Sequence, residues 1–149
     1  MTKAQSLRAD FEKAVARLDE ALALPKDPIV RDSAIQRFEI SFELCWKLLK
    51  AFLEEAHNAS CTSPRTCFRA AFRHGVIDND PFWIDLTILR NYTVHTYNEE
   101  LADYVYSRLA ETARRFRTVL VATGSLRRGA RPAWAQPPPR TRLTHPPRT

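Results

Sequence analysis

The chain has 149 residues and a formal net charge of +6. This length suits one domain, and its 44% of apolar residues can form a core without disulfides. Six of the 23 basic residues, all arginines, fall in 124–149, which has no Asp or Glu. The 17 that remain balance the 17 acidic residues. This balance excludes a uniformly basic nucleic-acid-binding surface on the folded part.

The sequence carries no sign of export or membrane insertion. Its first residues lack the apolar stretch of a signal peptide, and no run of about 18 apolar residues occurs. We therefore expect a cytoplasmic protein that does not contact a membrane. Because three cysteines are an odd number, Cys45, Cys61 and Cys67 are expected to be reduced thiols.

Few glycines and helical apolar spacing predict an all-α protein. A first amphipathic helix is expected over 3–24, ending at Pro25. Asp27-Pro28 is a typical helix start and opens a second helix that reaches about Asn58. Its apolar residues recur at alternating spacings of three and four, which predicts that this long helix is the centre of a bundle. The seam consists of Ile35, Phe38, Phe42, Cys45, Leu49 and Phe52.

Three further helices are expected. Ser63-Pro64 repeats the cap-and-proline signal for a helix over 64–74, with Phe68 and Phe72 pointing inward and Gly75 as its stop. A fourth helix starts at Asp80-Pro81 and a fifth at Asn98. These predictions give an up-and-down bundle of about five helices over 1–123.

The segment 124–149 combines six arginines with six of the ten prolines. Such a composition buries too little apolar surface to fold alone, so a disordered tail is expected.

Most familiar sites are excluded. The chain has too few glycines for a phosphate-binding loop, and no cofactor motif is present. A zinc site from His57, Cys61, Cys67 and His74 would need intervals that do not match common zinc spacings. We expect no metal and no cofactor.

An arginine followed five residues later by a histidine occurs three times, so the spacing alone singles out no site. Arg140 and His145 lie in the tail, and the pair Arg69 and His74 is explained by a helix end, where a cationic histidine is favourable. Arg90 falls near the end of the fourth helix.

Arg90 and His95 lie at a junction between helices, so both can point away from the core. Five residues separate them by about 140° around a helix, so one chain need not bring them together. Two copies across a two-fold axis could place both pairs in one cleft. An arginine can bind a phosphodiester, and a histidine can transfer protons near neutral pH. From spacing and position alone, a surface arginine and a histidine at a helix end remain the simpler interpretation.

Several segments together resemble one known family, the HepT-like HEPN toxins, also described as nucleotidyltransferase substrate-binding proteins. The resemblance covers about residues 4–122. The segments that carry it are Phe38-Glu39-Ile40-Ser41-Phe42-Glu43-Leu44-Cys45-Trp46-Lys47, Ser63-Pro64-Arg65, Trp83 and Arg90-Asn91-Tyr92-Thr93-Val94-His95-Thr96-Tyr97.

The resemblance implies a homodimeric helical bundle of the HEPN type and a toxin that acts as a metal-independent ribonuclease. It implies catalytic roles for Arg90 and His95, with Asn91 assisting. It also implies a partner, a minimal nucleotidyltransferase antitoxin, which neutralises the toxin by adenylylating Tyr97. Two alternatives stay open: a noncatalytic substrate-binding subunit of a nucleotidyltransferase, and a plain helical adaptor.

Overall fold

The computed structural model describes residues 1–78 and 81–124, and every regular element within them is a helix. The all-α prediction is confirmed. None of these helices is both long and apolar enough to cross a bilayer. Apart from Gly124, the predicted tail lies outside the described residues. The elements are α1 (Lys3–Leu22), α2 (Pro28–His57), α3 (Pro64–Arg73), α4 (Pro81–Tyr92), the 3₁₀ turn η1 (Thr93–His95), α5 (Glu99–Ser107) and α6 (Leu109–Ala122).

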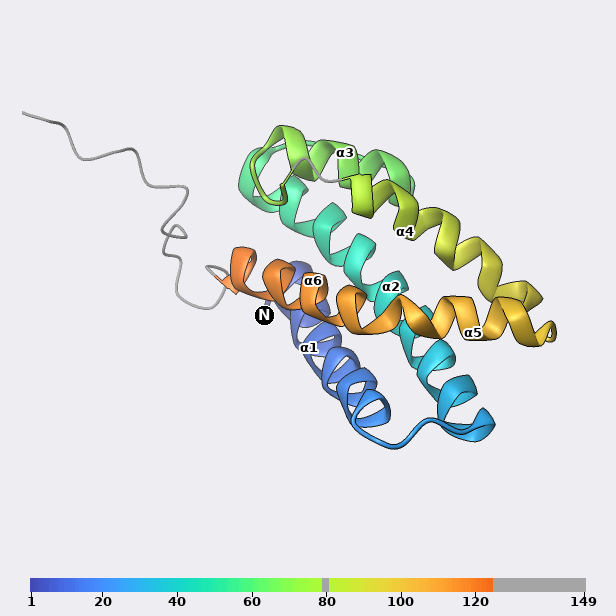
Figure 1. The fold of residues 1–149 in the computed structure, drawn as a ribbon. Helices are drawn as coiled ribbons and strands as arrows, with labels where there is room; N and C mark the ends of the chain where they lie inside the picture. The colour runs from blue at the N-terminus through green and yellow to red at the C-terminus, as the bar shows by residue number, and fades with distance from the viewer. Residues whose placement is uncertain (79–80, 125–149) are drawn as a thin grey trace, which may run out of the picture.

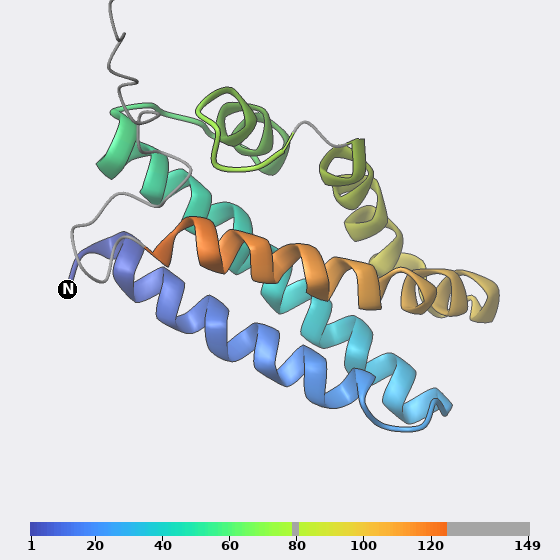
Figure 2. The ribbon, with the colours of Figure 1, turned by 60° about the vertical axis from the view of Figure 1, so that its left-hand side comes forward.

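The helix α2 forms the centre of the bundle. α1 returns antiparallel to it, and α6 lies against both (Figure 1). α3 packs on the C-terminal part of α2, and α4 leads from there to the far end of the molecule, where η1 turns the chain into α5 (Figure 2). The junction between α4 and α5 therefore lies at one end of the bundle.

The predicted seam of α2 is confirmed, because all six of its side chains are buried. Asp27 caps the helix by accepting a hydrogen bond from the Val30 amide at 2.7 Å. At the other end Asn58 takes the left-handed conformation with φ of 50°. Asparagine tolerates this conformation better than most residues, so it ends the helix at low cost.

Aromatic side chains join the three central helices. The ring of Phe116 on α6 meets that of Phe11 on α1 edge-on at 5.3 Å and stacks over that of Phe38 on α2 at 6.5 Å. All three are fully buried. Aromatic pairs at these separations add to the stabilisation from burial alone.

The helix α3 begins and ends as predicted. Ser63 caps it together with Thr66, and Gly75 follows its end with φ of 72°, where a side chain would be strained. One prediction here was wrong, since Phe72 is 42% exposed while Phe68 is buried. The short helix packs through one face only, and Phe72 lies beside that face.

The predicted fifth helix is two helices, α5 and α6, which meet at Arg108. The Ser107 hydroxyl donates to the Tyr104 carbonyl at 2.6 Å, and the Arg108 amide bonds the Val105 carbonyl instead. A serine hydroxyl competes in this way with the regular helical hydrogen bond. The two helices run almost in line (Figure 1), and their junction lines a pocket described below.

Candidate functional site

The predicted motif spans the last turn of α4, the turn η1 and the start of the loop before α5. Threonine hydroxyls tighten the backbone here. The Thr93 hydroxyl donates to the Arg90 carbonyl at 2.7 Å, and the Thr96 hydroxyl donates to the Thr93 carbonyl at 3.0 Å. Bonds of this three-residue reach favour a 3₁₀ turn over a continued α-helix. The segment therefore leaves the helix just after Tyr92.

Arg90 is held from two sides. Its Nη1 donates to the Thr93 hydroxyl oxygen at 2.7 Å. Its Nε lies 3.9 Å from Oε1 of Glu43 on α2, and the other oxygen of Glu43 accepts from the Trp46 indole at 3.1 Å. At 3.9 Å the Arg90–Glu43 contact is an ion pair without a hydrogen bond.

The Nε of Arg90 is buried and has no hydrogen-bond partner. A buried donor without a partner is costly, and such groups need an explanation. The Arg90 side chain as a whole is 27% exposed, so solvent can reach part of it. This arginine is thus fixed in place with donor capacity left over.

The other three predicted residues lie on the surface. Asn91 and His95 are exposed, and Tyr97 is 85% exposed. The structure brings His95 and Tyr97 together, with their rings edge-on at 6.1 Å. Within the described residues of one chain, no hydrogen bond joins Arg90 to His95.

A buried arginine anchors the chain just after the motif. Arg31 on α2 is 4% exposed, and its Nη1 lies 2.6 Å from Glu99 and 3.2 Å from Asp103 on α5, while its Nε bonds Asp32 at 3.0 Å. The hydrogen bond to Glu99 contributes most to raising the pKa of Arg31, and Arg31 in turn lowers the pKa of Glu99. Lys26 adds a contact of 3.0 Å to Asp103. These ion pairs fix the start of α5 against α2.

Two of the three cysteines differ from the prediction. Cys61 and Cys67 form a disulfide, so the expectation of reduced thiols was wrong for this pair. The loop after α2 brings the two α-carbons to 5.1 Å, which the spacing in sequence could not show. Cys45 is free and buried, and burial raises the pKa of its thiol.

The four residues of the excluded zinc site are split between two places. The rings of His57 and His74 lie 4.9 Å apart at the ends of α2 and α3. Cys67 lies seven residues before His74, or about 10 Å along α3. Among the described residues, no three His, Cys, Asp or Glu side chains are grouped as metal ligands. The pKa of His57 is lowered mainly by desolvation and, to a smaller extent, by the charge of His74.

The second arginine–histidine pair has a structural explanation. Arg69 is exposed on α3, and His74 is the residue that ends this helix, beside His57. The third pair, Arg140 and His145, lies outside the described residues. Sequence reasoning missed Glu43, Thr93 and Arg31 as residues that position the motif, although Glu43 and Thr93 lie in the segments that carry the family resemblance.

The fold is that of a helical bundle that presents a polar arginine- and histidine-containing turn at one end. The chain belongs to the family described as nucleotidyltransferase substrate binding protein like, which matches residues 7–121. It is 30% identical over 108 residues to a protein of Haemophilus influenzae named "Probable ribonuclease HepT", covering 66% of this chain and 74% of that protein.

Two solved structures share the fold. One, a crystal structure of a Thermus thermophilus protein, has a TM-score of 0.73 and 40% identity, and covers 79% of this chain and 99% of its own. The other is described as a substrate-binding domain of a nucleotidyltransferase from Haemophilus influenzae. It has a TM-score of 0.60 and 23% identity, and covers 81% and 96% of the two chains.

Proposed function

We propose that this protein is the toxin of a toxin–antitoxin pair and cleaves RNA in the cytoplasm without a metal ion. The observation that carries the proposal is Arg90, a guanidinium fixed by Thr93 and Glu43 with an unpartnered Nε, five residues before an exposed histidine. The 30% identity to a protein named as a probable ribonuclease supports this choice within the family.

The proposed active site forms between two copies of the chain. Each copy contributes Arg90 and His95, so the cleft of a homodimer contains two guanidinium groups and two imidazoles. A nucleic acid phosphate placed there can receive bidentate hydrogen bonds from Arg90.

The chemistry is an internal transfer at phosphorus. One neutral His95 takes the proton of the RNA 2′-hydroxyl while its oxygen attacks the adjacent phosphorus. The bond from phosphorus to the 5′-oxygen breaks, and a second, protonated copy of His95 gives that oxygen a proton. Arg90 stabilises the negative charge that grows on the non-bridging oxygens. Asn91, exposed beside Arg90, can donate a further hydrogen bond. The products are a 2′,3′-cyclic phosphate and a 5′-hydroxyl.

Control of this activity is assigned to Tyr97. A partner nucleotidyltransferase would transfer an adenylyl group from ATP to the Tyr97 hydroxyl and release pyrophosphate. The side chain is 85% exposed, so an enzyme can reach it. The new phosphodiester would carry negative charge next to His95, whose ring lies 6.1 Å from that of Tyr97. A bound phosphate beside the cleft competes with RNA for Arg90.

A second candidate is a noncatalytic subunit that binds substrate for a nucleotidyltransferase, and the description of the family favours it. The two candidates differ in one measurement. Wild type and His95→Ala, incubated with end-labelled RNA in EDTA, should differ in cleavage, and the wild-type product should carry a 5′-hydroxyl. His74→Ala is the matched control, because it removes the histidine of a pair with identical spacing. If wild type leaves RNA intact, the binding subunit is the better description.

The modification is tested separately. The protein is incubated with a candidate partner nucleotidyltransferase and ATP, and its intact mass is measured. Wild type should gain the mass of an adenylyl group and lose RNA cleavage, while Tyr97→Phe should stay unmodified and active. Modification of Tyr97→Phe to the same extent would show that Tyr97 is not the acceptor.

A further inference from the structure

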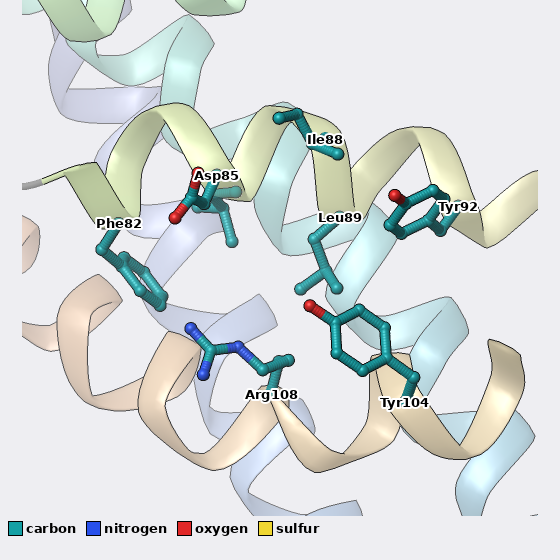
Figure 3. Close-up of a pocket in the computed structure, with 8 residues that line it drawn as sticks. Phe82, Asp85, Ile88, Leu89, Tyr92, Tyr104 and Arg108 are labelled. Atoms are coloured by element: carbon teal, nitrogen blue, oxygen red, sulfur yellow. The ribbon is translucent and has the colours of Figure 1, made fainter. Parts of the chain in front are cut away.

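A pocket of about 240 Å³ lies between α4 and the junction of α5 with α6 (Figure 3). Its floor is apolar and includes Leu86 and Leu89, which are buried. Ligand pockets for drug-sized molecules commonly measure about 300–1,000 Å³. This pocket is smaller, so it suits a single ring system rather than an extended cofactor.

An arginine without a carboxylate partner lies at one side of the pocket. The guanidinium of Arg108 lies 5.9 Å from the centre of the Phe82 ring, and no ion pair joins it to an acidic side chain of the described residues. Further along α6, Arg115 pairs with Glu111 at 2.9 Å. A guanidinium on an aromatic face keeps its N–H donors directed sideways, where they can bind a phosphate.

Two tyrosines also line the pocket, Tyr92 from α4 and Tyr104 from α5, one helical turn before Arg108. The rings of Tyr92 and Tyr104 meet edge-on at 6.2 Å, and the two side chains are 37% and 49% exposed. Figure 3 shows the Tyr104 hydroxyl directed toward the pocket, between Leu89 and Arg108. Exposed aromatic faces beside a cation are what single-stranded RNA-binding sites use to stack bases.

A carboxylate completes the lining. Asp85 on α4 borders the pocket opposite Arg108 on the other wall. A carboxylate accepts hydrogen bonds and donates none, so it favours a base that presents N–H groups on its edge. Guanine presents two such donors side by side, and uracil presents one.

We propose that this pocket holds one nucleotide of a single-stranded RNA, with its base against Tyr92 and Tyr104 and its phosphate on Arg108. The inference rests on the proposed ribonuclease function and deepens it by adding a base-binding subsite. Tyr92 follows Arg90 by two residues, which is about 200° around α4. The two side chains therefore lie on nearly opposite faces of α4, and a strand that reaches both would cross the exposed Asn91 between them.

The experiment measures binding of fluorescent single-stranded RNA to the full chain in the His95→Ala background, so that cleavage does not interfere. The probes are oligouridines with or without one guanosine, at fixed salt. Tyr104→Ala should weaken binding about 5- to 150-fold, the range for removal of one base-stacking aromatic. Arg108→Gln should also weaken binding and should reduce its salt dependence, because one phosphate contact is lost. Asp85→Asn should remove the preference for guanosine. Arg65→Gln, which removes an exposed arginine of α3, should change affinity less than about twofold.

The outcomes separate the pocket from the ribonuclease. Unchanged affinity in both Tyr104→Ala and Arg108→Gln, with melting curves like wild type, overturns the pocket assignment even if wild type cleaves RNA. If these variants lose RNA binding but wild type does not cleave RNA, the base-binding subsite is supported and the ribonuclease function is rejected. Failure of the His95→Ala protein to bind any probe overturns the pocket assignment, and the cleavage assay then decides the ribonuclease separately. Analytical ultracentrifugation tests whether a second copy of the chain covers the pocket instead. If Tyr104→Ala turns a dimer into monomers and each monomer binds RNA as before, the pocket is a dimer contact and the assignment is wrong. Tyr104→Phe, which keeps the ring, should bind like wild type.

Discussion

Replacing Thr93 by valine tests how firmly the structure holds Arg90. The Thr93 hydroxyl makes two hydrogen bonds, donating to the Arg90 carbonyl and accepting from the Arg90 guanidinium, both at 2.7 Å. Loss of the first costs about 1 kcal/mol. Loss of the second costs about 1.5 kcal/mol, the lower end of the range for charged donors, because the Arg90 side chain is 27% exposed. The buried methyl group of valine that replaces the hydroxyl stabilises the folded state by about 0.8 kcal/mol. The net destabilisation is about 2 kcal/mol.

A matched control exists on α6. Thr112 is also buried, and its hydroxyl donates to the Arg108 carbonyl at 2.7 Å without a hydrogen bond from a guanidinium. Thr112→Val should therefore cost less than about 0.5 kcal/mol by the same accounting. Urea unfolding followed by tryptophan fluorescence compares the two variants. Equal stability of Thr93→Val and Thr112→Val would refute the reasoning about Arg90.

Thr93→Val also tests whether Thr93 positions Arg90 for RNA cleavage. If the bond from Thr93 aims the guanidinium of Arg90, Thr93→Val should lower RNA cleavage roughly 10- to 100-fold, because small misplacements of a catalytic group are costly. Thr93→Ser keeps the hydroxyl and should retain most activity despite its missing methyl group. Equal activity of Thr93→Val and Thr93→Ser would show that this bond does not position Arg90 for catalysis.

Three further predictions follow from contacts elsewhere. Cys61→Ser opens a loop whose ends are 6 residues apart and should lower stability by about 2 kcal/mol, and a reducing agent should do the same to wild type but not to the variant. An unchanged wild-type melting curve in reductant would contradict the disulfide with Cys67. The hydrogen bond from Arg31 lowers the pKa of Glu99, so the stability that this carboxylate adds is full above the ordinary glutamate pKa of about 4.3 and is lost as pH falls through its lowered pKa. Acid titrations of wild type and Glu99→Gln should therefore differ at neutral pH and converge at low pH; a constant difference would refute the linkage. Phe116→Ala should cost about 3–5 kcal/mol in denaturant unfolding, and a cost under about 1 kcal/mol would show that the ring is not a central core element.

The helix boundaries were largely predictable from sequence because their signals are local. Asp27 and Ser63 each cap a helix through an amide three residues away, and Asn98 does the same for α5. Gly75 was recognisable as a stop because only glycine takes its backbone conformation without strain. The break at Arg108 was missed, since a serine hydroxyl inside an apolar helical pattern gives no clear signal that it will replace a backbone hydrogen bond.

For the candidate site too, the sequence order was predictable and the spatial surroundings were not. The order Arg90, Asn91, His95 and Tyr97 is a property of the sequence, and their assignment as site residues remains a prediction. Their surroundings depend on distant parts of the chain. Glu43 on α2 approaches Arg90 only because the tertiary fold brings the end of α4 near α2, and no spacing in sequence encodes that distance of 3.9 Å.

The sequence by itself determined an all-helical chain, the long central helix and the turn that carries an arginine and a histidine. These follow from apolar periodicity and from caps that act over three or four residues. Only the tertiary structure decided that Cys61 and Cys67 pair, that Arg31 reaches Glu99 across 68 residues, and that Arg90 keeps a buried nitrogen without a partner. Contacts of this kind arise when helices pack, because packing brings side chains together regardless of their distance along the chain.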